Sequence, residues 1–206
     1  MSEVTRIEQS PIKRELFYVY IGGAQDVLEL KHQTIRFFGL KAGDKLNDKK
    51  LKVLLEHDSY ERAKDVAFRF LSRGPKTEFE VFRHLRKKGF DEKTSLRVIA
   101  LCLEKGLLND YKYAEAYVEE FLRLKRGGRY KIWKKLMEKG ISRKIIQKVL
   151  RKGLTDDKQM ELALELAEKK LKLVKNKKGK KAKVFKYLIQ KGFGRNVAYK
   201  AVKSIT

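Results

Sequence analysis

Three copies of one short pattern recur in this sequence at intervals of 51 and 52 residues. Each copy ends on a glycine, at Gly89, Gly140 and Gly192. A leucine lies four residues before each glycine, an aromatic residue seven before and a β-branched residue eight before. A lysine always precedes the glycine, and Phe or Ile follows it. Matching at six positions in three copies indicates tandem structural repeats rather than chance.

The pattern describes a helix, its end and the start of the next helix. The apolar positions form one stripe of a helix, and the glycine is a C′ residue that closes the helix in the left-handed conformation. Asp91 and Ser142 are good N-caps for the helix that follows, and Gly194 is a tolerable one. A longer helix with the same kind of stripe precedes each copy, for example at Ala63–Leu71. Each repeat therefore contains three helices, and neighbouring repeats must stack because one alone buries too little core.

Residues 1–58 follow a different pattern. Val4–Gln9 and Glu15–Ile21 read as strands, and Gly22-Gly23 is a two-residue hairpin signal before a returning strand at Ala24–Leu30. A short helix at His32–Phe38 is expected to end at Gly39, and Asn47 or Asp48 to cap the next helix.

The predicted fold is mainly α: three tandem three-helix repeats in an elongated, curved array, with a small N-terminal extension that contains a β-hairpin. The predicted domains are residues 1–58, 59–108, 109–154 and 155–206.

Charge divides the chain at the same place. The whole chain has a net charge of +25, but residues 1–58 contribute only +1 and residues 59–206 contribute +24. From Arg123 to Lys152 there are 13 basic residues and one acid, and no acid follows Glu168. An excess this lopsided differs from the balanced ion pairs of thermophilic proteins and favours a nucleic-acid partner.

The candidate binding residues are the cations of two basic segments. Both segments surround glycines between helices, and each cation that neutralises a phosphate releases a counterion. Tyr130 is the one good candidate there for stacking on a base. The thirteen residues are Arg123, Lys125, Arg126, Arg129, Lys131, Lys134, Lys135, Lys175, Lys177, Lys178, Lys180, Lys181 and Lys183. The lysine before each repeat glycine has two readings, as a cation stabilised at a helix C-terminus or as a partner contact.

Several classes of protein are not supported. One cysteine, Cys102, excludes an internal disulfide and the common zinc sites. Three separate histidines, no phosphate-binding loop and no carboxylate pair predict no enzyme, no catalytic residue, no metal and no cofactor. The longest apolar runs, of six residues, are too short to cross a membrane, and no signal-peptide core is present. We therefore expect a cytoplasmic protein, and a monomer.

The stretch Gly106–Val118 resembles a motif of the RecX family, regulators of the RecA recombinase. It reads Gly-Leu-Leu-Asn-Asp, then after three residues Ala-Glu-Ala-Tyr-Val. Gly128, Ile132, Leu136 and Gly140 are similar to a second pattern of the family, in which glycine, isoleucine, leucine and glycine follow one another at intervals of four residues. The resemblance covers residues 60–206 well and 1–58 loosely, and the lysine-rich loop of the third repeat is longer and more basic than expected.

The resemblance implies a non-enzyme that binds the RecA–single-stranded-DNA filament and inhibits ATP hydrolysis, strand exchange and coprotease activity, in recombination, DNA repair and the SOS response. The implied partners are the RecA filament and single-stranded DNA, with duplex DNA as a further candidate. The alternative is a stand-alone basic DNA-binding protein with units like helix-turn-helix motifs.

Overall fold

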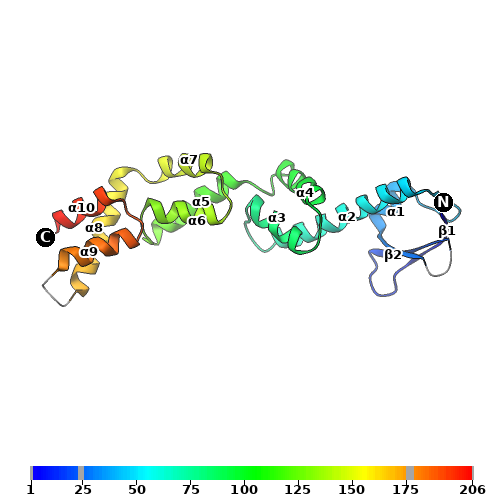
Figure 1. Cartoon of the computed structure of the whole chain (residues 1–206), viewed down its shortest axis with the longest axis horizontal. Helices are drawn as coiled ribbons and strands as arrows, with labels where there is room; N and C mark the ends of the chain where they lie inside the picture. Colours follow the sequence, from blue (N-terminus) through cyan, green and yellow to red (C-terminus); the bar gives the residue numbers. More distant parts are fainter. Residues whose placement is uncertain (1, 23–25, 175–178, 206) are drawn as a thin grey trace. The chain divides into compact units, whose positions relative to one another are not determined.

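The computed structural model describes residues 2–22, 26–174 and 179–205 (Figure 1). Within them the chain forms a small antiparallel sheet and ten helices. Two compact units are present: Met1–Pro75 together with Val81–Leu107, and Lys76–Glu80 together with Leu108–Thr206. The mainly helical prediction with an N-terminal strand region is confirmed.

The sheet contains β1 (Ser2–Gln9), β2 (Leu16–Ile21), β3 (Val27–Lys31) and β4 (Lys45–Leu46) in the order β3-β2-β1-β4. The prediction of a two-residue hairpin turn at Gly22-Gly23 is wrong. Tyr20 pairs with Val27, and the Ile21 N–H donates to the Asp26 carbonyl, so the returning strand begins three residues later than predicted. The connection therefore takes more than Gly22-Gly23, and it includes residues 23–25, which lie outside the described residues.

Two helices follow the first three strands in the first compact unit. The first, α1 (His32–Phe38), ends at Gly39 in the left-handed conformation, and the second, α2 (Asp48–Leu71), is capped by the Asn47 side chain, both as predicted. The apolar core lies between the sheet and these helices. It contains Val4, Val19, Ile21, Leu30, Leu40, Leu46 and Leu54.

A buried polar network joins β3 and α1 to α2. The Asp58 carboxylate accepts hydrogen bonds from the Lys31 backbone N–H (2.7 Å) and the Thr34 hydroxyl (2.9 Å). It also pairs with Arg62 at 2.6 Å, and the buried Lys31 ammonium pairs with Asp65. Each buried charge has a partner, as burial requires. Helix α2 runs without a break past residue 58, so the change in charge falls inside a helix.

Three successive three-helix motifs account for the rest. The first consists of α2 with α3 (Glu78–Lys87) and α4 (Glu92–Glu104), and the second of α5 (Asp110–Arg123), α6 (Arg129–Glu138) and α7 (Arg143–Gly153). The third consists of α8 (Asp156–Leu173), α9 (Lys180–Gln190) and α10 (Arg195–Ser204). The second and third motifs each have a core of their own, around Leu136 and Leu188.

The predicted helix ends are confirmed. Gly89, Gly140 and Gly192 have φ values of +91°, +78° and +85°. The Asp91 side chain accepts the Thr94 N–H at 2.6 Å, the Ser142 hydroxyl caps α7, and Gly194 caps α10 without a side chain.

Two of these glycines also have a packing role that Gly89 lacks. A Cβ on Gly140 would lie 2.2 Å from the Phe79 Cβ, and one on Gly192 would lie 2.5 Å from the Lys131 nitrogen. A Cβ on Gly89 would meet nothing within 4 Å in the part of the chain that the structure describes. At Gly140 and Gly192, therefore, a neighbouring segment leaves no room for a side chain.

Backbone hydrogen bonds hold these contacts in the second unit. The Gly128 N–H donates to the Lys191 carbonyl (2.9 Å), and the Tyr130 N–H donates to the Gly192 carbonyl (3.0 Å). The start of α6 thus binds the carbonyls that the end of α9 leaves free. Thr77, in the segment grouped with the second unit, makes the corresponding contact through its hydroxyl, which donates to the Lys139 carbonyl at 2.7 Å.

Candidate nucleic-acid interface

Of the thirteen predicted binding residues, the ten that the structure describes lie on the second unit. Arg123 ends α5, Lys125 and Arg126 lie in the loop after it, and Arg129, Lys131, Lys134 and Lys135 lie on α6. Lys180, Lys181 and Lys183 lie at the start of α9. The remaining three, Lys175, Lys177 and Lys178, lie outside the described residues.

Four cations gather around Lys131 on α6. Burial lowers the pKa of Lys131, and the charges of Lys191, Lys135 and Arg126 lower it further. Lys191 comes from the end of α9 and stood in the sequence only as part of the lysine column. We call Arg126, Lys131, Lys135 and Lys191 the basic cluster. The other three members repel the charge of Lys131, although Lys135 also pairs with Glu138 at 2.9 Å and Arg126 with Glu120 at 4.0 Å. An anion bound at the cluster would relieve the repulsion on Lys131.

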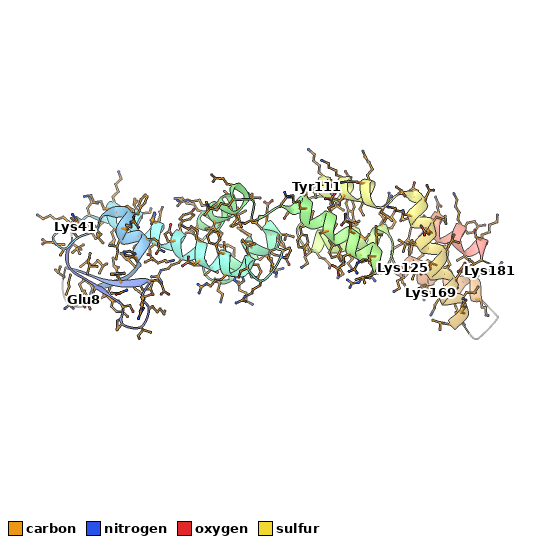
Figure 2. All side chains as sticks on the ribbon, turned by 180° about the vertical axis from the view of Figure 1, so that it is seen from behind. Glu8, Lys41, Tyr111, Lys125, Lys169 and Lys181 are labelled. Carbon is orange, nitrogen blue, oxygen red and sulfur yellow. The ribbon has the colours of Figure 1, made fainter. Side chains whose placement is uncertain are left out.

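Other predicted residues hold the unit together. Lys125 and Lys169 approach the same Glu165 carboxylate, at 2.6 and 2.9 Å, and both are labelled in Figure 2. The half-buried Arg129 donates to the Leu154 carbonyl at 3.0 Å and pairs with Asp156 at 3.2 Å. These side chains have intramolecular partners, so their contribution to a partner surface is smaller than their charge suggests.

The lysine column differs from one position to the next. Lys139 pairs with Glu80 at 2.5 Å, and this contact raises the pKa of Lys139. Lys191 lies over the Tyr187 ring, 5.4 Å from its centre, and belongs to the basic cluster. Among the described ion pairs none involves Lys88. One sequence position therefore serves different contacts in the three motifs.

Cations also occupy helix starts, where the helix dipole disfavours them. The first turns of α6, α7, α9 and α10 contain no acid but carry basic residues, among them Lys180 and Lys181 on α9. By contrast, α5 and α8 begin with aspartates. Arg143, Lys144 and Arg195 belong to this set and were not among the predicted residues. The lack of acid in these first turns would have identified them. Such placement costs stability unless an anion approaches.

An open groove that one exposed aromatic ring lines, that of Tyr130, lies beside the basic cluster. It has a volume of about 540 Å³ and is lined by Tyr130, Ile189 and the segment 192–197. Tyr130 is 65% exposed. Tyr199, which does not line the groove and which the sequence did not single out, is 62% exposed on α10. Exposed rings near cations suit single-stranded nucleic acid, whose bases stack on aromatic side chains.

Groups with catalytic potential have structural surroundings instead. Burial raises the pKa of the Cys102 thiol. Each histidine stacks on a phenylalanine: His32 on Phe17, His57 on Phe37 and His84 on Phe70. Within residues 2–22, 26–174 and 179–205, no group of three His, Cys, Asp or Glu side chains is placed to bind a metal. In the same part of the chain, no helix has the length and apolar character needed to span a membrane.

Comparison with known proteins agrees with the arrangement in three motifs. Three family models match in order: the first RecX three-helix domain at residues 63–101, the second at 109–150 and the third at 156–202. The regulatory protein RecX of Clostridium tetani is 35% identical and the alignment covers 94% of this chain and 89% of that protein. That of Clostridium perfringens strain 13 is 34% identical, over 100% of this chain and 97% of that protein.

Solved structures show the same fold. A crystal structure of regulatory protein RecX matches with a TM-score of 0.77 at 23% identity, covering 99% of this chain and 100% of that chain. RecX from Lactobacillus salivarius matches with a TM-score of 0.67 at 27% identity, covering 72% of this chain and 97% of that chain.

Proposed function

Because this chain belongs to the RecX family of regulatory proteins, we propose that it binds the RecA–single-stranded-DNA filament and inhibits the ATPase, strand-exchange and coprotease activities of RecA. The observation that carries the proposal is the ordered match to all three RecX domains. The family is regulatory rather than enzymatic. With RecA and DNA as partners, the protein would act in the cytoplasm.

The charge distribution supports a partner that contains DNA. The basic cluster joins cations from α6, from the loop before it and from the end of α9. The first turns of α9 and α10 add more cations, and Tyr130 offers an exposed ring. Each cation that neutralises a phosphate of single-stranded DNA changes the slope of log K against log salt by about 0.7.

The decisive experiment compares two titrations at the same salt concentration. One follows the single-stranded-DNA-dependent ATPase of the cognate RecA, and the other follows binding to the same DNA without RecA. Inhibition at concentrations well below those that coat free DNA supports a RecA-directed regulator. Inhibition that appears only as free DNA becomes saturated contradicts it and favours the stand-alone DNA-binding protein.

A pair of double variants tests the surface. Lys131→Gln with Lys135→Gln removes two charges of the basic cluster. Lys49→Gln with Lys52→Gln removes two exposed charges from α2 and serves as the matched control. We expect the first variant to need about tenfold more protein for half-inhibition and the control to behave as wild type. Equal behaviour of the two variants would show that the basic cluster is not the contact surface.

A further inference from the structure

A small pocket between the ends of α2 and α3 gathers cations that the proposed function does not use. Its volume is about 310 Å³, at the lower limit of ligand pockets. All of its lining residues belong to the first unit. They are Val66, Arg69, Phe70, Arg73, His84 and Lys88.

Three permanent cations and a histidine line this pocket without an acid among the lining residues. The Arg69 Nε donates to the Asp65 carbonyl at 3.3 Å, and no described carboxylate lies within ion-pair distance of Arg69, Arg73 or Lys88. Elsewhere in the unit cations do pair with acids, as Lys64 does with Glu61 at 2.8 Å. The pocket therefore concentrates positive charge that the described residues leave uncompensated.

The histidine in the wall has a defined position. Its ring stacks on Phe70, with centres 4.1 Å apart and planes 5° from parallel. Arg69 and Arg73 approach from α2 and its end, and Lys87 and Lys88 from the end of α3. Burial lowers the pKa of His84, and the charges of Lys88, Arg73 and Lys87 lower it further. A bound anion would offset these charges and raise that pKa again.

We propose that this pocket is a phosphate-binding site, in which Arg69, Arg73 and Lys88 hold the phosphate oxygens and His84 donates a further hydrogen bond. The ligand is a phosphate group, carried either by a nucleic-acid backbone or by a small phosphate compound. A phosphate offers more acceptor oxygens than a carboxylate, and two guanidinium groups with an ammonium match that number. The Phe70 ring and Val66 supply an apolar wall that strengthens the charge interactions.

This site is independent of the basic cluster, which lies on the other unit. The proposal holds or fails separately from RecA regulation, because its test measures phosphate binding alone.

The test uses the full chain and two probes, inorganic pyrophosphate and a short oligothymidylate. Calorimetry measures affinity, and NMR follows the titration of His84, whose signals are assigned by comparison with His84→Gln. The variant is Arg73→Gln with Lys88→Gln, both exposed, so the fold should be retained. The control is Lys49→Gln with Lys52→Gln, which removes the same number of charges from the first turns of α2.

We expect a bound probe to raise the pKa of His84 in the wild type and in the control. We expect the pocket variant to bind at least tenfold more weakly. Pyrophosphate binding with this pattern identifies a small phosphate compound as a sufficient ligand, whereas the pattern with the oligothymidylate alone identifies a nucleic-acid backbone. If neither probe moves the His84 titration, or if the pocket variant binds both probes as the control does, the proposal is overturned.

Discussion

Alanine substitutions at three glycines of the second unit measure separately the free-energy cost of a left-handed backbone and the cost of filling a close contact. Gly179 has a φ of +77°, and a Cβ there would meet no atom of the described residues within 4 Å. Gly128 has an ordinary φ of −94°, but its Cβ would lie 2.6 Å from the Gly192 carbonyl oxygen. Gly192 combines a φ of +85° with a Cβ position 2.5 Å from the Lys131 nitrogen.

The expected losses follow from these geometries. Gly179→Ala should lose about 1–2 kcal/mol of stability, because alanine is strained in the left-handed backbone conformation. Gly128→Ala should lose about 1–3 kcal/mol of stability, because the added Cβ displaces the backbone that it meets. The lower conformational entropy of the alanine-containing unfolded chain offsets part of this loss. Gly192→Ala combines both costs and should lose about 2–5 kcal/mol. At Gly128 and Gly192 the nearest obstructing atom is a backbone atom, so rotation of a side chain cannot relieve the clash.

Trp133 provides the assay. It is the only tryptophan of the chain and packs against the core of the second motif, so its fluorescence during urea unfolding reports on the second unit. Helix content by circular dichroism is the control for each variant. A Gly192→Ala variant no less stable than Gly179→Ala would refute the close docking of the α9 end against the start of α6. A Gly128→Ala variant with the same free energy of unfolding as the wild type would also refute this docking, because Gly128 lies on the α6 side of the contact.

Three further predictions concern single charges. Lys131→Gln should leave the free energy of unfolding unchanged or higher at pH 7, and should lower the slope of log K against log salt for single-stranded-DNA binding by about 0.7. Because the pKa of Lys131 is lowered in the folded protein, the wild type becomes more stable as pH rises through that pKa. Urea unfolding at several pH values should show this increase in the wild type and not in the variant. Asp91→Ala should cost about 1 kcal/mol and Asp91→Asn much less, because only alanine removes the α4 cap. Because the Thr94 N–H lowers the pKa of Asp91, the cap's contribution is present above the ordinary aspartate pKa and disappears as pH falls through the lowered value, which unfolding at several pH values would show. Burial raises the pKa of Asp110, whose carboxylate accepts the Glu78 N–H, so ionisation costs stability as pH rises through that pKa. Asp110→Asn should therefore be at least as stable as wild type at pH 7, with an advantage that grows as pH rises from the ordinary aspartate pKa through the raised one; a loss of stability at pH 7 would contradict this.

Local features of the fold could be predicted from the sequence. The helix ends at Gly89, Gly140 and Gly192 and the caps at Asp91 and Ser142 depend on residues within one turn, so sequence spacing identifies them. The return strand was misplaced because the length of a connection depends on strand register as well as on glycines. The elongated, curved array and the four domain boundaries stay predictions.

The candidate site divides in the same way. The excess of positive charge follows from the composition, and its concentration on the basic segments follows from the order of the residues. The partners of each cation do not: Arg129 is held by Leu154 and Asp156, whereas Lys131 faces other cations. Distances across the fold decide such contacts, and sequence separation carries little information about them.

The repeat glycines show most clearly what each level determines. Their spacing by itself establishes three similar helix ends, because a left-handed C′ residue is a local requirement that glycine meets best. Only the tertiary structure distinguishes Gly89, which faces open space, from Gly140 and Gly192, which receive a neighbouring segment. In the same way, only folding brings Arg73 and Lys88 together at one pocket. A conformational preference acts within a few residues, whereas packing and charge act between surfaces that are far apart in the chain.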